Sequence, residues 1–146
     1  MNDKRPMFVS GTAWIFAGLA AAGLVFTAGS SADPPPAHKT VRMVIDYADG
    51  VEKHFTTLAW REGATVFDVM EAAGKHPRGI RVQYRDYGGS AGRLVTGIDG
   101  LANQGGGQDA RNWLYQVNEV RAKRACDKQT VEAGDTVVWK FDLQKP

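Results

Sequence analysis

Two aromatic-rich stretches near the C-terminal end restrict the fold most, because apolar side chains recur in them at every second position. The alternating residues are Trp113, Tyr115 and Val117 in the stretch 112–119, and Val137, Trp139 and Phe141 in the stretch 132–141. A period of two is typical of β-strands with one face against a core. We therefore expect two strands that supply much of the core, with Gly134 and Asp135 forming the turn before the second strand.

The same alternation recurs earlier in the chain. Apolar residues at every second position from Val41 to Tyr47 predict one strand, and residues 52–58 predict a second. Asp49 and Gly50 lie between the two and are typical of a hairpin turn. We therefore expect a β-hairpin here.

A short helix is expected to follow this hairpin. Thr65 can cap its first turn, where the carboxylate of Asp68 is also favourable. The residues Val66, Val69, Met70 and Ala73 fall at helical spacing and form one apolar stripe. The pattern predicts a helix that runs to Ala73 and ends at Gly74 in a left-handed conformation.

Residues 81–87 and 93–98 predict one more pair of strands, joined by a glycine-rich loop, with a register that the pattern leaves open. The element order is thus two strands, one helix, a strand pair and two late strands. This order predicts an α+β fold, a β-grasp-like mixed sheet with one packed helix.

The N-terminal segment has the features of an export signal. Residues 7–26 carry no charge, Lys4 and Arg5 precede them, and small residues come before Asp33. At 1.5 Å per residue the apolar run would also span roughly 30 Å as an uncleaved membrane anchor, so cleavage and anchoring both remain open. Either outcome predicts a periplasmic or extracellular location for the rest of the chain.

Three parts are therefore expected: a signal peptide or membrane anchor at 1–32, a proline-rich linker at 33–40, and the β-grasp domain at 41–142. Residues 1–32 contain two of the 18 basic and one of the 16 acidic residues, so the remainder has a net charge of +1. A nearly neutral domain gives no reason to expect a nucleic-acid partner.

Reactive side chains are too scattered to indicate catalysis or metal binding. Cys126 is the only cysteine and is expected to be a small, half-buried residue without a role. The histidines at positions 38, 54 and 76 do not have the spacing of metal ligands. Ser90 lacks the sequence of a catalytic elbow. We therefore expect a protein that is not an enzyme and that has no metal and no cofactor of its own.

Four segments together carry a resemblance to a known family. They are residues 65–70, 95–101, 113–118 and 134–139. In order and spacing they resemble a domain of uncharacterised function that is similar to the C-terminal domain of transcobalamin and intrinsic factor. The resemblance covers about residues 41–142 and implies a β-grasp framework.

The resemblance also implies a candidate ligand, cobalamin, and a difference in one turn. In the cobalamin carriers this domain closes over the corrinoid from one side, and a separate helical barrel holds the other side. Cobalamin is thus a ligand by resemblance alone. The family usually turns after its Trp strand with Asn-Gly, whereas Glu119 follows Asn118 here. Because a tight turn would force Glu119 to a positive φ, we expect a wider turn.

Two loops that lack a core pattern are the candidate binding region. The candidate ligand-binding residues are Tyr87, Arg93, Asn103, Gln104 and Gln108. Their ring, charge and amides suit a polar ring-bearing or sugar-like molecule. Flexible connections without a ligand are the alternative.

Two functions follow as hypotheses. The first is an exported, non-enzymatic β-grasp binding module for a small molecule or polysaccharide. The second is an envelope protein-interaction domain without a small-molecule ligand. The expected partners are a small molecule or an envelope protein, and the membrane itself if the N-terminal segment is retained.

Overall fold

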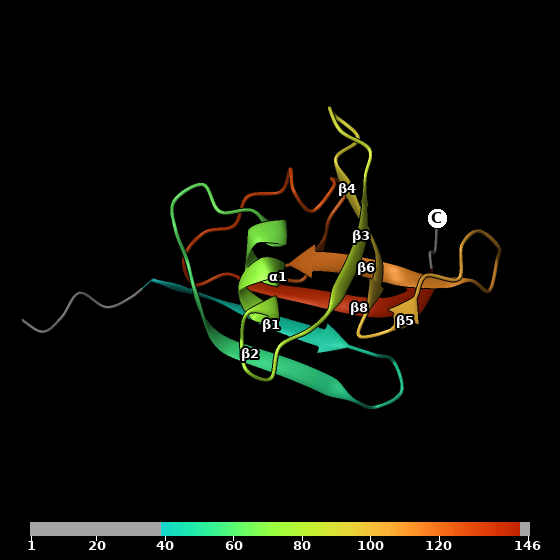
Figure 1. Cartoon of the computed structure of the whole chain (residues 1–146), viewed down its shortest axis with the longest axis horizontal. Helices are drawn as coiled ribbons and strands as arrows, with labels where there is room; N and C mark the ends of the chain where they lie inside the picture. Colours follow the sequence, from blue (N-terminus) through green and yellow to red (C-terminus); the bar gives the residue numbers. More distant parts are fainter. Residues whose placement is uncertain (1–38, 144–146) are drawn as a thin grey trace, which may run out of the picture. The chain divides into compact units, whose positions relative to one another are not determined.

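The computed structural model describes residues 39–143, which contain one helix and eight strands (Figure 1). In chain order these are β1 (Thr40–Asp46), β2 (Glu52–Ala59), α1 (Val66–Gly74), β3 (Val82–Asp86), β4 (Arg93–Ile98), β5 (Leu101–Ala102), β6 (Arg111–Val117), β7 (Val120–Arg121) and β8 (Thr136–Leu143). The expected export or anchor segment and most of the linker lie outside the described residues. Within residues 39–143, no helix is long and apolar enough to cross a membrane.

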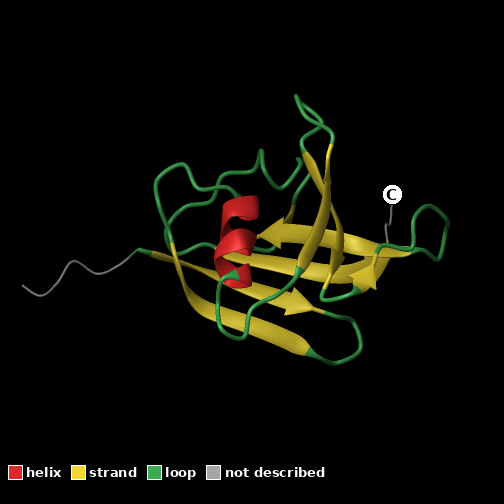
Figure 2. Cartoon of the chain, viewed as in Figure 1, coloured by secondary structure: helices red, strands yellow, loops and turns green. Residues whose placement is uncertain are grey.

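Five strands form the main sheet, in the order β2-β1-β8-β6-β7. β1 and β8 are parallel, whereas the other neighbours are antiparallel. Helix α1 packs across one face of this sheet (Figure 2). The predicted α+β fold with one helix on a mixed sheet is therefore confirmed.

The strand pair in the middle of the chain forms a second sheet, with β5, in the order β3-β4-β5. The sequence pattern did not separate this pair from the main sheet. Val95 and Ile98 of β4 are buried in the core, and the ring of Tyr84 on β3 meets Phe67 of α1 at 4.8 Å between centroids. The second sheet thus covers part of the core beside the helix.

Helix α1 begins as expected and ends differently. The Thr65 hydroxyl accepts a hydrogen bond from the Asp68 backbone N–H, and the Asp68 carboxylate accepts one from the Thr65 backbone N–H. This reciprocal pair is the capping box that fixes the helix start. The predicted left-handed end at Gly74 is wrong, because Gly74 is the last helical residue and the cap, Lys75, has a right-handed φ of −79°.

The two aromatic-rich strands pair as the alternation predicts. β6 lies antiparallel to β8, with Trp113 opposite Phe141 and Tyr115 opposite Trp139. Trp113, Trp139 and Phe141 are buried in the core, and Tyr115 packs against it from a half-buried position. Cross-strand aromatic pairs of this kind stabilise a sheet.

The turn between β6 and β7 is tight, so the expected wider turn is wrong. Val117 pairs with Val120, which leaves only Asn118 and Glu119 to connect the strands, with φ of 47° and 68°. The Asn118 side chain donates to an Asp135 carboxylate oxygen at 2.7 Å and accepts from the Thr136 N–H at 2.9 Å. These bonds tie the turn to the start of β8 and offset the unfavourable backbone of Glu119.

Replacing Glu119 by glycine should stabilise the protein. Glycine adopts a positive φ without a clash at Cβ, so we expect Glu119→Gly to raise the free energy of unfolding by about 0.5–1 kcal/mol in urea denaturation. Ala133→Gly is the control, because Ala133 lies in the exposed turn before β8 with a φ outside the left-handed region. The control should lose stability; a loss in both variants would show that Glu119 is not strained.

Candidate functional site

A cavity of about 370 Å³ lies between β4, β6, β8 and the segment 121–126, which we call the basic loop. One side of the cavity is apolar, and its main side chains are Leu94, Val95, Trp113, Tyr115 and Trp139. The other side is cationic, with Arg93, Arg121, Lys123 and Arg124. The volume is within the range of small-molecule sites.

The register of β6 with β8 builds the apolar side. Tyr115 and Trp139 are cross-strand partners whose ring centroids lie 4.9 Å apart with the planes tilted by 33°. Trp113 packs against Phe141 at 5.4 Å between centroids. The cavity therefore has a rigid aromatic wall, because the rings that form it are also held by the core.

Hydrogen bonds hold the basic loop over this wall. The Tyr115 hydroxyl donates to the Arg124 carbonyl at 2.7 Å, and the Ala122 N–H donates to the Tyr115 carbonyl at 3.1 Å. At the far end of the loop, the Phe67 N–H at the start of α1 donates to the Cys126 carbonyl at 3.0 Å. The loop backbone is thus anchored to both β6 and α1.

Gly92 allows the β3–β4 hairpin to approach the basic loop. Its φ is 65°, and a Cβ at this position would lie 2.8 Å from the Cβ of Ala125. Next to it, the Arg93 N–H donates to an Asp127 carboxylate oxygen at 2.8 Å. A larger residue at position 92 would therefore push apart two walls of the cavity.

Arg93 is held in place by an ion pair and two rings. Its Nε lies 3.1 Å from an Asp86 carboxylate oxygen, and its guanidinium lies 4.4 Å from the Phe67 ring centroid and 5.4 Å from that of Tyr84. The backbone N–H of Gly88 and the Arg93 guanidinium hold the pKa of Asp86 below its usual value. Arg93 is thus oriented before any ligand arrives.

The indole of Trp139 has a buried donor without a partner. Trp139 is 2% exposed and lines the cavity, and its Nε1 makes no hydrogen bond with any described residue. In contrast, Trp60 Nε1 donates to the Val131 carbonyl and Trp113 Nε1 to the Leu101 carbonyl, each at 2.8 Å. A buried N–H that lacks an acceptor is unfavourable, so a bound acceptor at Trp139 would stabilise the fold.

Cys126 lies at the inner end of the basic loop and is buried, not half-buried as expected. Its thiol lies 3.5 Å from the Arg93 carbonyl. Burial, together with the nearby Asp127, raises the pKa of Cys126 to about 11. The thiol is therefore protonated at neutral pH and is a poor nucleophile.

The five residues predicted as ligand contacts are not brought together. Arg93 lines the cavity, whereas Asn103 is used inside the fold: its side-chain amide donates to the Val95 carbonyl, and its side-chain oxygen accepts from the Trp113 N–H. The Gln104 side-chain oxygen accepts from the Arg111 N–H at 2.8 Å. Both amides therefore join strands in the structure.

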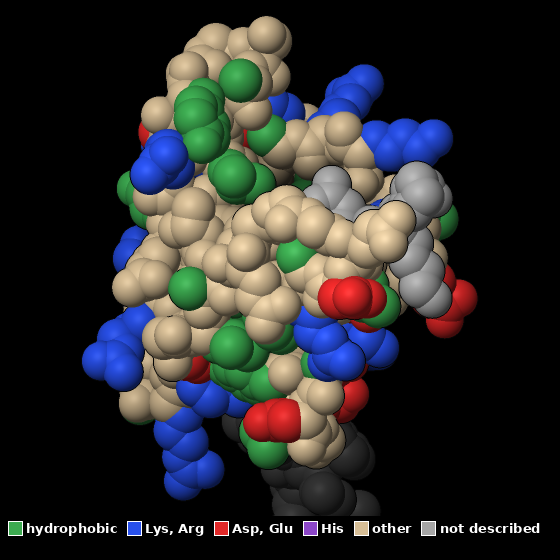
Figure 3. Space-filling view, turned by 90° about the vertical axis from the view of Figure 1, so that its right-hand side faces the viewer, with side chains coloured by type: hydrophobic (Ala, Val, Ile, Leu, Met, Phe, Trp, Pro, Cys, Tyr) green, Lys and Arg blue, Asp and Glu red, His purple; other side chains and the backbone are tan. Residues whose placement is uncertain are grey.

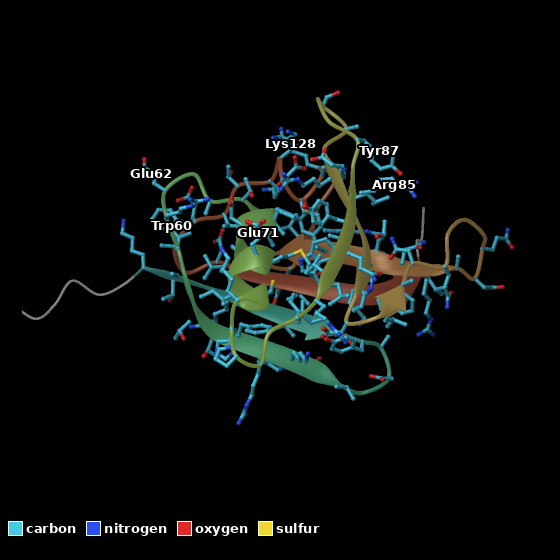
Figure 4. The ribbon with its side chains drawn as sticks, viewed as in Figure 1. Trp60, Glu62, Glu71, Arg85, Tyr87 and Lys128 are labelled. Carbon is cyan, nitrogen blue, oxygen red and sulfur yellow. The ribbon has the colours of Figure 1, made fainter. Side chains whose placement is uncertain are left out.

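Tyr87 and Gln108 are exposed in two different loops. Tyr87 follows β3, and its side chain points outward from the hairpin (Figure 4). Gln108 lies in the loop between β5 and β6. The two loops lie apart, at the top and the right of Figure 1. Ligand contact by either residue stays a prediction.

Sequence reasoning assigned the cavity rings only to the core and gave the basic loop no role. The strand pattern identifies Trp113, Tyr115 and Trp139 as inward-facing, but it does not show that these rings line a cavity. The run Arg121-Ala122-Lys123-Arg124 was the available signal, since its cations follow directly after an aromatic strand.

A second polar cluster lies at an open groove of about 500 Å³ near the β1–β2 turn. Asp99 accepts hydrogen bonds there from the Tyr47 hydroxyl, from Lys53 Nζ at 2.7 Å and from the Arg81 N–H at 2.8 Å. These groups satisfy one another, so they are less available for a ligand. Among the described residues, no three His, Cys, Asp or Glu side chains converge as a metal site.

Comparison with known proteins places the chain in a family and a fold. Residues 63–142 match the domain of unknown function DUF4430. A candidate metal-binding protein from Ruminococcus gnavus ATCC 29149 is similar in structure, with a TM-score of 0.55 and 16% identity over 74% of this chain and 100% of that chain. Haptocorrin in complex with Cbi is also similar, with a TM-score of 0.58 and 20% identity over 73% of this chain.

The structural similarity shows the fold alone. The transcobalamin-like resemblance is therefore confirmed as a likeness of fold. This chain corresponds to 26% of the haptocorrin chain, so the shared fold is one part of that protein. The comparison with curated proteins finds no significant match.

The Asp99 cluster predicts a pH dependence of stability. Burial favours a higher pKa for Asp99, but hydrogen bonds from Lys53, Tyr47 and Arg81 outweigh it and lower the pKa. The carboxylate therefore stabilises the fold above the usual carboxyl pKa of about 4, and this stabilisation is lost as the pH falls through the lower pKa of the folded state.

We expect Asp99→Asn to reduce the free energy of unfolding at pH 7 by on the order of 1 kcal/mol, since partial exposure screens the charge. Asparagine accepts the positive φ of 51° at this position. Urea denaturation should show the difference from the wild type shrinking as the pH falls below the usual carboxyl pKa of about 4. Asp109→Asn, in an exposed loop, is the control. A difference that is constant with pH would exclude the charge as its cause.

Proposed function

We propose that this chain, which belongs to the family of domains of unknown function DUF4430, is an exported, non-enzymatic binding module for a small molecule. Its ligand site is the cavity between β4, β6, β8 and the basic loop. The observation that carries the proposal is the buried, unpartnered Nε1 of Trp139, a residue that lines that cavity. A ligand that supplies an acceptor would satisfy it.

The chemistry of the cavity favours binding over catalysis. The Cys126 thiol is held protonated, and burial, with Cys126 and Asp127 nearby, raises the pKa of Tyr115. The described lining residues contain no histidine and no carboxylate that could act as a general base. We therefore assign the site a binding role and no catalytic residues.

A corrinoid is one candidate ligand. Haptocorrin, in its complex with Cbi, shares the fold of this chain. The chain resembles only the smaller part of that protein, so the cavity would contact part of a corrinoid. The candidate metal-binding relative provides a second line of comparison, but no metal-binding group is found among residues 39–143.

The N-terminal segment supports a location outside the cytoplasm. Its basic residues, uncharged run and small residues form the pattern of an export signal or anchor. We propose that the domain faces the periplasm or the cell exterior, either released or attached to the inner membrane. Protease added to intact spheroplasts should then degrade the domain, whereas a cytoplasmic protein should be protected.

A protein-interaction domain is the second candidate function, and the β3–β4 hairpin favours it. Tyr87 is 56% exposed and Leu94 is 48% exposed. Figure 3 shows apolar side chains at the top of the molecule, where this hairpin lies. Exposed apolar groups of this kind are typical of protein-contact surfaces.

An NMR titration separates the two functions. The purified full-length chain is titrated with Cbi and with a heparin-like polysaccharide, and we expect one of them to shift the backbone signals of residues 93–95, 113–115 and 121–126. Ala91→Trp, which places a large ring at the cavity border, should weaken this binding at least tenfold. Ala102→Trp, exposed on β5 away from the cavity, is the matched control.

Signals that do not shift at millimolar concentrations of both probes would argue against the small-molecule site. In that case the hairpin surface becomes the leading candidate. Cross-linking through Tyr87→Cys in intact cells would then be expected to capture an envelope protein.

A further inference from the structure

We propose that the cavity selects an anionic molecule with a planar ring, whose ring packs on Tyr115 beside the buried Trp139 and whose carboxylate or phosphate meets the basic loop. The inference rests on the proposed binding function and names its ligand class. Three features of the cavity support it: an aromatic wall, a donor that lacks an acceptor, and an uneven distribution of charge.

The aromatic wall indicates a flat, apolar contact surface on the ligand. The tilted rings of Tyr115 and Trp139 come from adjacent strands, and the Tyr115 hydroxyl is already bonded to the Arg124 carbonyl. The Tyr115 ring can therefore offer its face and edge, but its hydroxyl is committed. A planar ring stacks on such a wall with little loss of conformational freedom.

The Trp139 donor indicates that the ligand also carries an acceptor. Of the three tryptophans in the described part of the chain, two donate to backbone carbonyls, and only Trp139 lacks a partner. Because Trp139 is 2% exposed, its N–H has little access to solvent. A ring oxygen, a carboxylate or a phosphate oxygen that enters the cavity would supply the missing acceptor.

The charge distribution indicates that the acceptor belongs to an anion. Four cationic residues line the cavity, and none of its described lining residues is acidic, although the chain outside the N-terminal segment is nearly neutral. Arg93 is paired with Asp86, and Lys123 and Arg124 are exposed on the basic loop. Clustered cations at the mouth of an apolar cavity attract anions and bind them through charge-assisted hydrogen bonds.

The cavity differs in this respect from the other hollows of the domain. In the groove beside Asp99, Lys53 Nζ is paired with the Asp99 carboxylate at 2.7 Å. The hollow along β2, of about 360 Å³, has Phe55 as its one aromatic ring apart from two histidines. Among the described residues, aromatic rings, an unpartnered donor and the exposed cations Lys123 and Arg124 therefore coincide at the basic loop.

The test uses matched ring compounds and the full-length chain. 2-Naphthoate and 1-naphthyl phosphate are the anionic probes, and 2-naphthalenemethanol is the neutral probe with the same ring. We expect the anions to bind at least tenfold more tightly, with affinity that falls as NaCl rises from 50 to 500 mM. The comparison between the two anions distinguishes a carboxylate from a phosphate ligand.

The indole N–H signals provide a readout within the cavity. On binding of an anion, the Trp139 signal should move, whereas the signals of Trp60 and Trp113 should move little, because both are already bonded to carbonyls. Trp139→Phe keeps a ring and removes the donor, so it should weaken anion binding about tenfold. Its native fold is checked from the dispersed signals of β1 and β2.

Charge variants complete the test. Lys123→Gln combined with Arg124→Gln should weaken the anions about tenfold and leave 2-naphthalenemethanol unchanged. Lys75→Gln, at the end of α1 and outside the cavity, is the matched control and should leave all affinities unchanged.

The outcomes separate this inference from the proposed function. Equal binding of the neutral and anionic probes at the cavity would overturn the anionic class and keep the binding module. If Cbi or the polysaccharide binds at the cavity and the naphthyl anions do not, the anionic class is likewise overturned and the binding module is kept. An unmoved Trp139 signal on anion binding would overturn the role of its N–H, and no binding of any probe at the cavity would overturn both proposals.

Discussion

The antiparallel pairing of β6 with β8 is the interaction on which the core and the candidate site both depend. It sets Trp113 against Phe141 and Tyr115 against Trp139, so one register packs the interior and builds the cavity wall. A slip of β6 by one residue would turn Trp113 and Tyr115 to the other face of the sheet. Site and stability are therefore coupled, because the same side chains serve both.

The sequence predicted those parts of the fold that follow from local chemistry. Alternating residues identified the strands, and Thr65 with Asp68 identified the helix start, because periodicity and capping act over a few neighbours. The turn at Glu119 could not be predicted in the same way. Its backbone is held by bonds from Asn118 to Asp135 and Thr136, which are close only after the sheet has formed.

The candidate site was less predictable because it consists of contacts between distant segments. Asn103 and Gln104 had the composition of ligand contacts, yet their amides join strands, and only the folded chain shows this. Arg93 was identified from its own loop, but its approach to the basic loop depends on Gly92, whose neighbours lie more than thirty residues later. No sequence pattern indicates that Trp139 Nε1 lacks a hydrogen-bond acceptor.

The central position of β8 affects how the domain can be made. β8 pairs with β1 on one side and β6 on the other, although it comes last among the described strands. During synthesis, β1 and β6 have no shared neighbour until residues 136–143 emerge. The main sheet therefore cannot form as one layer until β8 is available to join β1 to β6.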